Sequence, residues 1–181
     1  SVTSAATVTV ANVNDDPTGS VTISGTPAED QVLTAANTLA DEDGLGTITY
    51  QWKQAGVAIN SATNSTYTPT QEDVGKAITV TASYTDNFSN PHSVTSAATA
   101  AVENLNDAPT GSVTIAGTPT EDQTLTAINN LADEDGLGTI AYHWNRAGEP
   151  GVIATGSTYT LAQDDVDKTI TVTGSYTDLQ N

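Results

Sequence analysis

Residues 47–53 read TITYQWK, and residues 77–85 read AITVTASYT. In the first stretch, Ile48, Tyr50 and Trp52 occupy alternate positions, and Thr or Gln residues lie between them. In the second stretch, Ile, Val, Ala and Tyr alternate with Thr and Ser in the same way. A period of two is typical of a half-buried antiparallel strand, with apolar side chains facing a core and Thr side chains facing water. Both stretches therefore predict strands of an all-β fold.

Clusters of Gly, Pro, Asn and Asp divide the same part of the chain into seven expected strands. In the last of them, Val94, Ala98, Ala100 and Val102 are expected to share the inward face. Seven short strands with a central Trp describe an antiparallel β-sandwich of two sheets. The expected strand ranges are 19–25, 31–39, 47–54, 57–63, 65–70, 77–86 and 92–104.

The chain of 181 residues contains one internal repeat. Residues 1–89 align with residues 93–181 at an offset of 92 without a gap, and 60 of the 89 pairs are identical. The stretch SVTSAAT occurs at residues 1–7 and again 92 positions later, and LADEDGLGTI at residues 39–48 recurs in the same way. A period near 90 residues is too long for the unit of a helical solenoid. The repeat therefore predicts two tandem sandwich domains.

The repeat also sets the expected domain boundaries. Residues 1–16 are expected to be the last strand and linker of a preceding repeat, residues 17–108 repeat one with its linker, and residues 109–181 repeat two without its final strand. The chain begins with neither an initiator Met nor a signal peptide, so we expect a piece of a longer protein. Since residues 1–10 match the last strand of repeat one, head-to-tail strand donation between copies is expected at the open edge of repeat two.

The charge of the chain excludes several classes of partner. It has 22 acidic residues against 4 basic ones, which gives a formal net charge of −18. Such a charge repels phosphate, so neither nucleic acid nor an anionic membrane surface is an expected partner. The chain has no Cys, which excludes disulfides and zinc ribbons. No apolar stretch approaches about 18 residues, so no membrane insertion is expected.

Several stretches of the sequence resemble known families. Tyr50-Gln51-Trp52, followed by residues 71–76 (QEDVGK), resembles an immunoglobulin-like domain, which implies a core position for Trp52 and a corner between two strands at residues 71–76. Residues 102–109 (VENLNDAP) resemble the linker between cadherin domains. Together with residues 133–136 (DEDG), they resemble the Ig-like and cadherin-like repeats of giant bacterial surface adhesins of the RTX type. The resemblance implies an extracellular location at the bacterial cell surface.

The acidic residues are expected to gather at the ends of the sandwiches, because loops of alternate strands share a pole. Stacked repeats would bring carboxylates of both domains and of the linker together, and like charges this close repel strongly without a cation. An oxygen-only ligand set with many members favours Ca²⁺ over Mg²⁺ and over transition metals. The expected ligands at the junction are Glu29, Glu72, Asp73, Asn104, Asn106, Asp107, Asp133, Asp135 and Asp178, and those of an equivalent site above repeat one are Asp15, Asp41, Asp43 and Asp86. The alternative is that these residues form solvated turns without a metal.

These expectations favour a structural spacer: a Ca²⁺-stiffened repeat that extends a distal binding domain from the cell surface, with neighbouring repeats as its partners. The alternative is a glycan-binding or cell-contact module, for which the most variable region, residues 57–61 (VAINS) against residues 149–153 (EPGVI), would be the recognition surface. Catalysis is not expected, because the carboxylates lie on exposed poles without a cleft. His92 and His143 are expected to be surface residues without a repeated nucleophilic partner.

Overall fold

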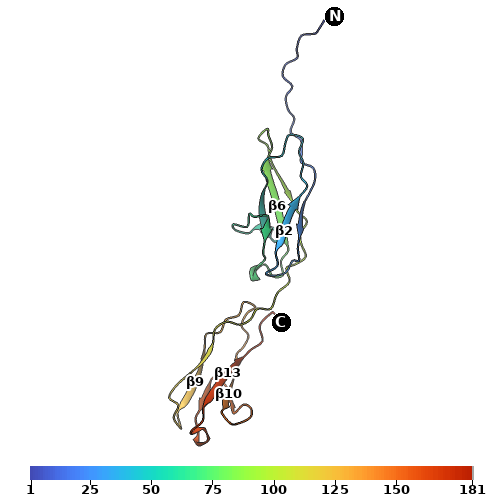
Figure 1. Ribbon diagram of the computed structural model, residues 1–181. Coiled ribbons are helices and arrows are strands. Elements are labelled where there is room, and N and C mark those ends of the chain that lie inside the picture. Colours follow the sequence, from blue (N-terminus) through green and yellow to red (C-terminus); the bar gives the residue numbers. More distant parts are fainter. Residues whose placement is uncertain (181) are drawn as a thin grey trace. The chain divides into compact units, whose positions relative to one another are not determined.

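The computed structural model describes residues 1–180 and confirms an all-β protein of two β-sandwich units. Unit 1 comprises Ser1–Leu105, and unit 2 begins at Asn106. Figure 1 shows that arrows, not coiled ribbons, form the body of each unit. Within residues 1–180 the only helical elements are two single turns of 3₁₀ helix, η1 (Gln71–Asp73) and η2 (Gln163–Asp165). No helix of this part of the chain is long and apolar enough to cross a membrane.

Unit 1 contains two antiparallel sheets that enclose one core. One sheet has the order β1-β2-β5 and the other the order β4-β3-β6-β7. Each strand lies within a range expected from the sequence or within one residue of it, and most are shorter than expected. The strands are β1 (Val21–Ser24), β2 (Leu33–Asn37), β3 (Thr49–Gln54), β4 (Val57–Ala58), β5 (Thr66–Tyr67), β6 (Ile78–Thr85) and β7 (Pro91–Thr95).

Trp52 lies at the centre of the core of unit 1, as expected, with 0% of its surface exposed. It stands on β3, which pairs with β6 so that Trp52 faces Val80 across the ladder. Its indole N–H donates to the backbone carbonyl of Asn64 at 2.9 Å, which satisfies the one polar atom of the side chain. Leu33 from the facing sheet and Ile78 from β6 are also completely buried, so both sheets contribute to one core.

The segment that follows β7 corrects the expected face of the last strand. Val102 is 2% exposed, but Ala98 and Ala100 are exposed. The segment bonds to β6 and to the residues before it only at every third residue: Ser96, Thr99 and Val102 donate their backbone N–H groups to the carbonyls of residues 80, 78 and 76. A spacing of three between inward contacts is incompatible with a regular alternation, so the alanines between them face water.

Unit 2 repeats the two sheets of unit 1. Its sheets have the orders β12-β9-β8 and β11-β10-β13, and Trp144 on β10 is 0% exposed. In unit 1, β7 pairs with β6, and the positions that would align with β7 lie beyond residue 181. Residues 1–16 form no strand, and Figure 1 shows them as an extended trace. The strands of unit 2 are β8 (Val113–Ala116), β9 (Thr124–Asn129), β10 (Ala141–Arg146), β11 (Ala154–Thr155), β12 (Thr158–Thr160) and β13 (Ile170–Ser175).

Candidate metal site

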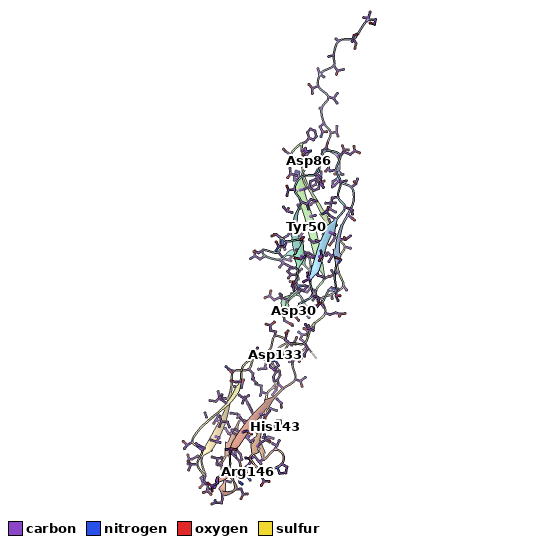
Figure 2. All side chains as sticks on the ribbon, in the orientation of Figure 1. Asp30, Tyr50, Asp86, Asp133, His143 and Arg146 are labelled. Atoms are coloured by element: carbon purple, nitrogen blue, oxygen red, sulfur yellow. The ribbon has the colours of Figure 1, made fainter. Side chains whose placement is uncertain are left out.

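The acidic residues of unit 2 gather at one end of its sandwich. The backbone N–H of Asp107 donates to Asp135 Oδ2 at 2.7 Å, and the N–H of Asp135 donates to Asp133 Oδ1 at 3.0 Å. Asp178 follows β13 and reaches the same end. Figure 2 shows Asp133 at the opposite end of this unit from Arg146, with His143 between them. We call Asp107, Asp133, Asp135 and Asp178 the acidic pole of unit 2.

The same arrangement recurs in unit 1. There the backbone N–H of Asp15 donates to Asp43 Oδ2 at 2.8 Å, and the N–H of Asp43 donates to Asp41 Oδ1 at 2.9 Å. Asp86 follows β6, and Figure 2 shows it at the opposite end of the unit from Asp30. We call Asp15, Asp41, Asp43 and Asp86 the acidic pole of unit 1. The pole is therefore a property of the repeated sequence and not of one copy.

A Tyr hydroxyl holds the first Asp of each DEDG stretch. Tyr84 donates to Asp41 Oδ2 at 2.5 Å, and Tyr176 donates to Asp133 Oδ2. Burial and the hydrogen bond to Asp41 raise the pKa of Tyr84 to about 12. The hydrogen bond to Asp133, together with burial, raises the pKa of Tyr176 to about 12. Both tyrosines therefore stay protonated donors that fix the orientation of the carboxylate beside them.

Asp135 keeps one carboxylate oxygen without a partner. The residue is 2% exposed, and its Oδ1 accepts no hydrogen bond within the described structure, whereas Oδ2 accepts from Asp107. Buried polar atoms in folded proteins are almost always hydrogen-bonded or bound to an ion or a water molecule. At the same pole lies a hollow of about 400 Å³ whose lining includes Asn106, Asp107, Asp133 and Asp178. A cation in this hollow would find oxygen ligands on several sides.

A further carboxylate lies close to the same pole. One carboxylate oxygen of Asp107 and one of Glu134 lie within 4.8 Å of each other, a separation that a single cation can bridge. In unit 1 a hollow of about 320 Å³ is lined by Asp15, Asp16, Asp41 and Glu42 among others, and Asp15 and Glu42 align with Asp107 and Glu134. Each unit thus brings together acidic groups that could bind a metal ion.

Asp86 and its counterpart Asp178 each accept from the backbone N–H two residues further along the chain. The carboxylate of Asp86 accepts from the backbone N–H groups of Phe88 and Asn90, both at 2.8 Å, and from the Asn90 side chain. Burial alone would raise the pKa of Asp86, but these donors and His92 outweigh it and lower the pKa below its usual value. Asp178 Oδ1 accepts from the backbone N–H of Gln180 at 3.1 Å. Asp86 is thus a fixed carboxylate within its own loop.

His92 is not the surface residue that the sequence predicts. Its side chain is only 8% exposed, and its ring stacks on Tyr84 with the ring centroids 5.3 Å apart. Its Nε2 lies 3.7 Å from Asp41 Oδ2 and 3.6 Å from Asp86 Oδ2. The position arises because β7 pairs with β6 and sets His92 opposite Tyr84. His143 on β10 is half-buried.

At the other end of unit 1, the structure brings Glu29 beside the residues that leave the unit. Glu29 is 2% exposed, and its Oε2 lies 3.4 Å from the backbone N–H of Leu105. The side-chain amide of Gln71 is placed to donate to the Glu29 carboxylate, at 3.0 Å, and to Asn104 Oδ1, at 3.2 Å. The side chain of Glu72 is exposed. Glu29 and Asn104 therefore lie together, and Gln71 joins them without having been expected from the sequence.

Asp73 is occupied by the turn in which it lies. Its carboxylate accepts from the Tyr67 hydroxyl at 2.5 Å, from Gln54 Nε2 at 2.7 Å and from the backbone N–H of Thr70 at 3.0 Å. These bonds close the corner at η1 that the immunoglobulin-like resemblance implies. They account for the burial of Asp73, so its expected role as a metal ligand has no support in these contacts.

Unit 2 builds the same corner with an ion pair that sequence reasoning missed. Arg146 Nε lies 2.6 Å from Asp165 Oδ1, and the Tyr159 hydroxyl donates to Asp165 Oδ2 at 2.8 Å. Burial alone would raise the pKa of Asp165, but the donors Ala162 N–H, Tyr159 and Arg146 outweigh it and lower the pKa. Arg146 aligns with Gln54, and Asp165 aligns with Asp73. The replacement of a Gln by an Arg was therefore the sequence signal from which this ion pair could have been predicted.

We expect Asp165→Asn to remove part of the acid sensitivity of unit 2. Because the pKa of Asp165 is lower in the folded state, its contribution to stability is complete above the unfolded value of 3.8 and is lost as the pH falls through the folded value. The melting temperature of unit 2 in the parent chain should therefore fall below pH 4 more steeply than in the variant. The control is Asp164→Asn at the exposed neighbour. Equal acid profiles for Asp165→Asn and the parent would contradict this role.

No protein-family model matches the sequence, and no curated protein matches it. Among solved structures, a similar one holds three N-terminal domains of the highly immunogenic outer capsid protein (Hoc) of bacteriophage RB49, with 21% identity and a TM-score of 0.35 over 87% of this chain and 55% of that one. Another is the apo structure of Bacteroides uniformis β-glucuronidase 3, with 8% identity and a TM-score of 0.23 over 91% of this chain and 25% of that one. The chain thus spans about half and a quarter of these two chains. Likenesses this distant carry no argument about function.

Proposed function

We propose that the chain is a structural spacer of an extracellular bacterial adhesin, in which Ca²⁺ bound at the acidic poles stiffens a string of Ig-like repeats. The observation that carries the proposal is the buried Asp135 Oδ1 without a partner, set among three further aspartates at the pole. A buried carboxylate oxygen left unpaired is costly, and a bound cation removes that cost.

The ligand chemistry supports Ca²⁺ over other cations. The pole of unit 2 offers carboxylate and amide oxygens, and neither pole offers a thiolate, since the chain has no Cys. Hard dications prefer such oxygens, and Ca²⁺ accepts six to eight of them in flexible geometry, whereas Mg²⁺ demands a near-ideal octahedron. In unit 2 the ligands would be Asp107, Asp133, Asp135 and Asp178, with Asn106 from the lining of the hollow and Glu134, which has an oxygen within 4.8 Å of one of Asp107.

The spacer role is supported by the repetition of the sequence. The two repeats share their core Trp, their acidic pole and their corner Asp, as expected for units that do the same mechanical work. Under this proposal bound Ca²⁺ stiffens each repeat together with the linker residues that lead into it wherever Ca²⁺ is abundant, as it is outside cells. The glycan-binding alternative stays a prediction, for which a glycan array with single repeats is the test.

We expect the folded chain to bind Ca²⁺, because a bound cation relieves the electrostatic repulsion among the carboxylates. Asp135→Asn should strongly weaken Ca²⁺ binding at unit 2. The measurement is calorimetric titration of the metal-stripped chain with Ca²⁺ and separately with Mg²⁺. Asp164→Asn is the matched control, since it removes one exposed carboxylate at the opposite end of the same unit. Unchanged Ca²⁺ affinity in Asp135→Asn, or equal losses in both variants, would show that the pole is a set of solvated turns.

A further inference from the structure

The Nε2 atom of His92 points at the acidic pole of unit 1. The His92 side chain is 8% exposed, so more than nine-tenths of it is buried, and Nε2 forms no hydrogen bond within the described residues. It lies 3.7 Å from Asp41 Oδ2 and 3.6 Å from Asp86 Oδ2, which is too long for a hydrogen bond. Buried polar atoms without a partner are rare in folded proteins, so this nitrogen points to a bound ligand.

The two carboxylates that face His92 are buried as well. The side chains of Asp41 and Asp86 are 0% exposed. Among the described residues, neither forms an ion pair with a Lys or an Arg. One imidazole carries at most a single positive charge, so it cannot balance two carboxylates, and buried charge without a counter-charge is costly. A dication between the three groups would balance both carboxylates.

Each of the three side chains is also held in place by a second contact. His92 stacks on Tyr84, with the ring centroids 5.3 Å apart, because the pairing of β7 with β6 sets the two residues opposite each other. Asp41 Oδ2 accepts from the Tyr84 hydroxyl at 2.5 Å. Asp86 accepts from the backbone N–H and from the side-chain amide of Asn90, both at 2.8 Å. Outer contacts of this kind orient the ligands of metal sites before the ion binds.

The spacing and the chemistry of these groups fit a transition-metal dication. Zn²⁺ lies about 2.0–2.2 Å from nitrogen and carboxylate oxygen ligands, so two ligands of a tetrahedral Zn²⁺ are about 3.3–3.6 Å apart. The distances of 3.6 and 3.7 Å from His92 Nε2 to the carboxylate oxygens are close to that range. Imidazole nitrogen is a ligand for Zn²⁺, Cu²⁺ and Ni²⁺, whereas Ca²⁺ and Mg²⁺ take oxygen ligands. The buried imidazole therefore gives this pole a ligand that the oxygen-only set expected from the sequence lacks.

We propose that the acidic pole of unit 1 binds a transition-metal dication of the Zn²⁺ class through His92 Nε2, Asp41 Oδ2 and Asp86 Oδ2. Water fills the remaining coordination positions. All three ligands belong to unit 1, so the proposal does not rest on Ca²⁺ binding at the pole of unit 2. Because Asp41 and Asp86 also belong to the oxygen set expected for Ca²⁺, the two ions compete at unit 1.

The test compares substitutions of the two histidines of the chain. His92→Gln should lower the affinity for Zn²⁺ at least tenfold, because the loss of a group that merely orients a metal ligand already costs about 10–100-fold. His143→Gln is the matched control and should leave the affinity unchanged, since it removes the other imidazole and introduces the residue that repeat one has at the aligned position, Gln51. The measurement is calorimetric titration of the metal-stripped chain with Zn²⁺. Asp135→Asn in unit 2 should keep the full Zn²⁺ affinity, which separates this site from the Ca²⁺ site proposed there.

A second measurement uses the unaltered chain and so does not depend on the folding of a variant. In nitrogen NMR of the two imidazole rings, Zn²⁺ should shift the Nε2 resonance of His92 as expected for metal coordination, and should leave the resonances of His143 in place. Ca²⁺ should not produce this coordination shift. A Zn²⁺ titration that shifts neither ring, or both rings equally, would overturn the proposal. Equal losses of Zn²⁺ affinity in His92→Gln and His143→Gln, or a loss in Asp135→Asn, would overturn it as well.

Discussion

Trp144→Ala should unfold unit 2 and leave unit 1 folded, whereas Trp52→Ala should do the reverse. Each Trp is 0% exposed at the centre of its own core, and truncating a buried Trp to Ala typically costs about 3–5 kcal/mol. That loss is comparable to the whole stability of a small domain. Far-UV circular dichroism should therefore show about half of the β signal lost in each variant, because the two units have similar strand content.

The remaining Trp provides the control for each variant. In Trp144→Ala the fluorescence of Trp52 reports unit 1 alone, and its emission should stay that of a buried indole. In Trp52→Ala the fluorescence of Trp144 reports unit 2 in the same way. A shift of the remaining Trp to solvent-exposed emission in Trp144→Ala would mean that unit 1 depends on unit 2 for its fold.

The sequence was sufficient to predict most of the fold because local pattern and burial agree. Alternation placed Ile48, Tyr50 and Trp52 on the face that packs against the core, and the structure confirms it. The repeat extended that prediction to β10 and Trp144. Alternation failed at Ala98 and Ala100, because the segment beyond β7 contacts its neighbours at every third residue, and no local pattern distinguishes this from a strand.

The acidic pole could be predicted in part. The DEDG stretches and their Asx-type bonds are local, so the grouping of Asp41 with Asp43 follows from sequence. The Tyr84 hydroxyl and the buried His92 depend on the pairing of β6 with β7 and not on sequence spacing, so polarity alone placed His92 at the surface incorrectly. The sequence placed Asp73 among the expected metal ligands, although its carboxylate accepts hydrogen bonds within its own turn. An Asp in a loop has the same sequence pattern whether it closes a turn or binds a metal ion.

The two units should unfold separately, with unit 2 first. Ten apolar residues form the buried core of unit 1, against four in unit 2, so unit 2 hides less apolar surface from water. Full burial of one Val contributes about 1.5–3 kcal/mol, and a typical intramolecular hydrogen bond about 1 kcal/mol. In unit 1 the segment around Val102 adds both a buried Val and several hydrogen bonds. The free energy of unfolding of unit 2 should therefore be lower than that of unit 1 by several kcal/mol. Urea unfolding of Trp144→Phe and Trp52→Phe reports each unit through its single remaining Trp.

The order of unfolding is read from the two urea midpoints. A single coincident transition for both Trp residues, or a lower urea midpoint for unit 1 than for unit 2, would contradict the prediction. Either result would show that the difference in buried apolar core does not set the order in which the units unfold.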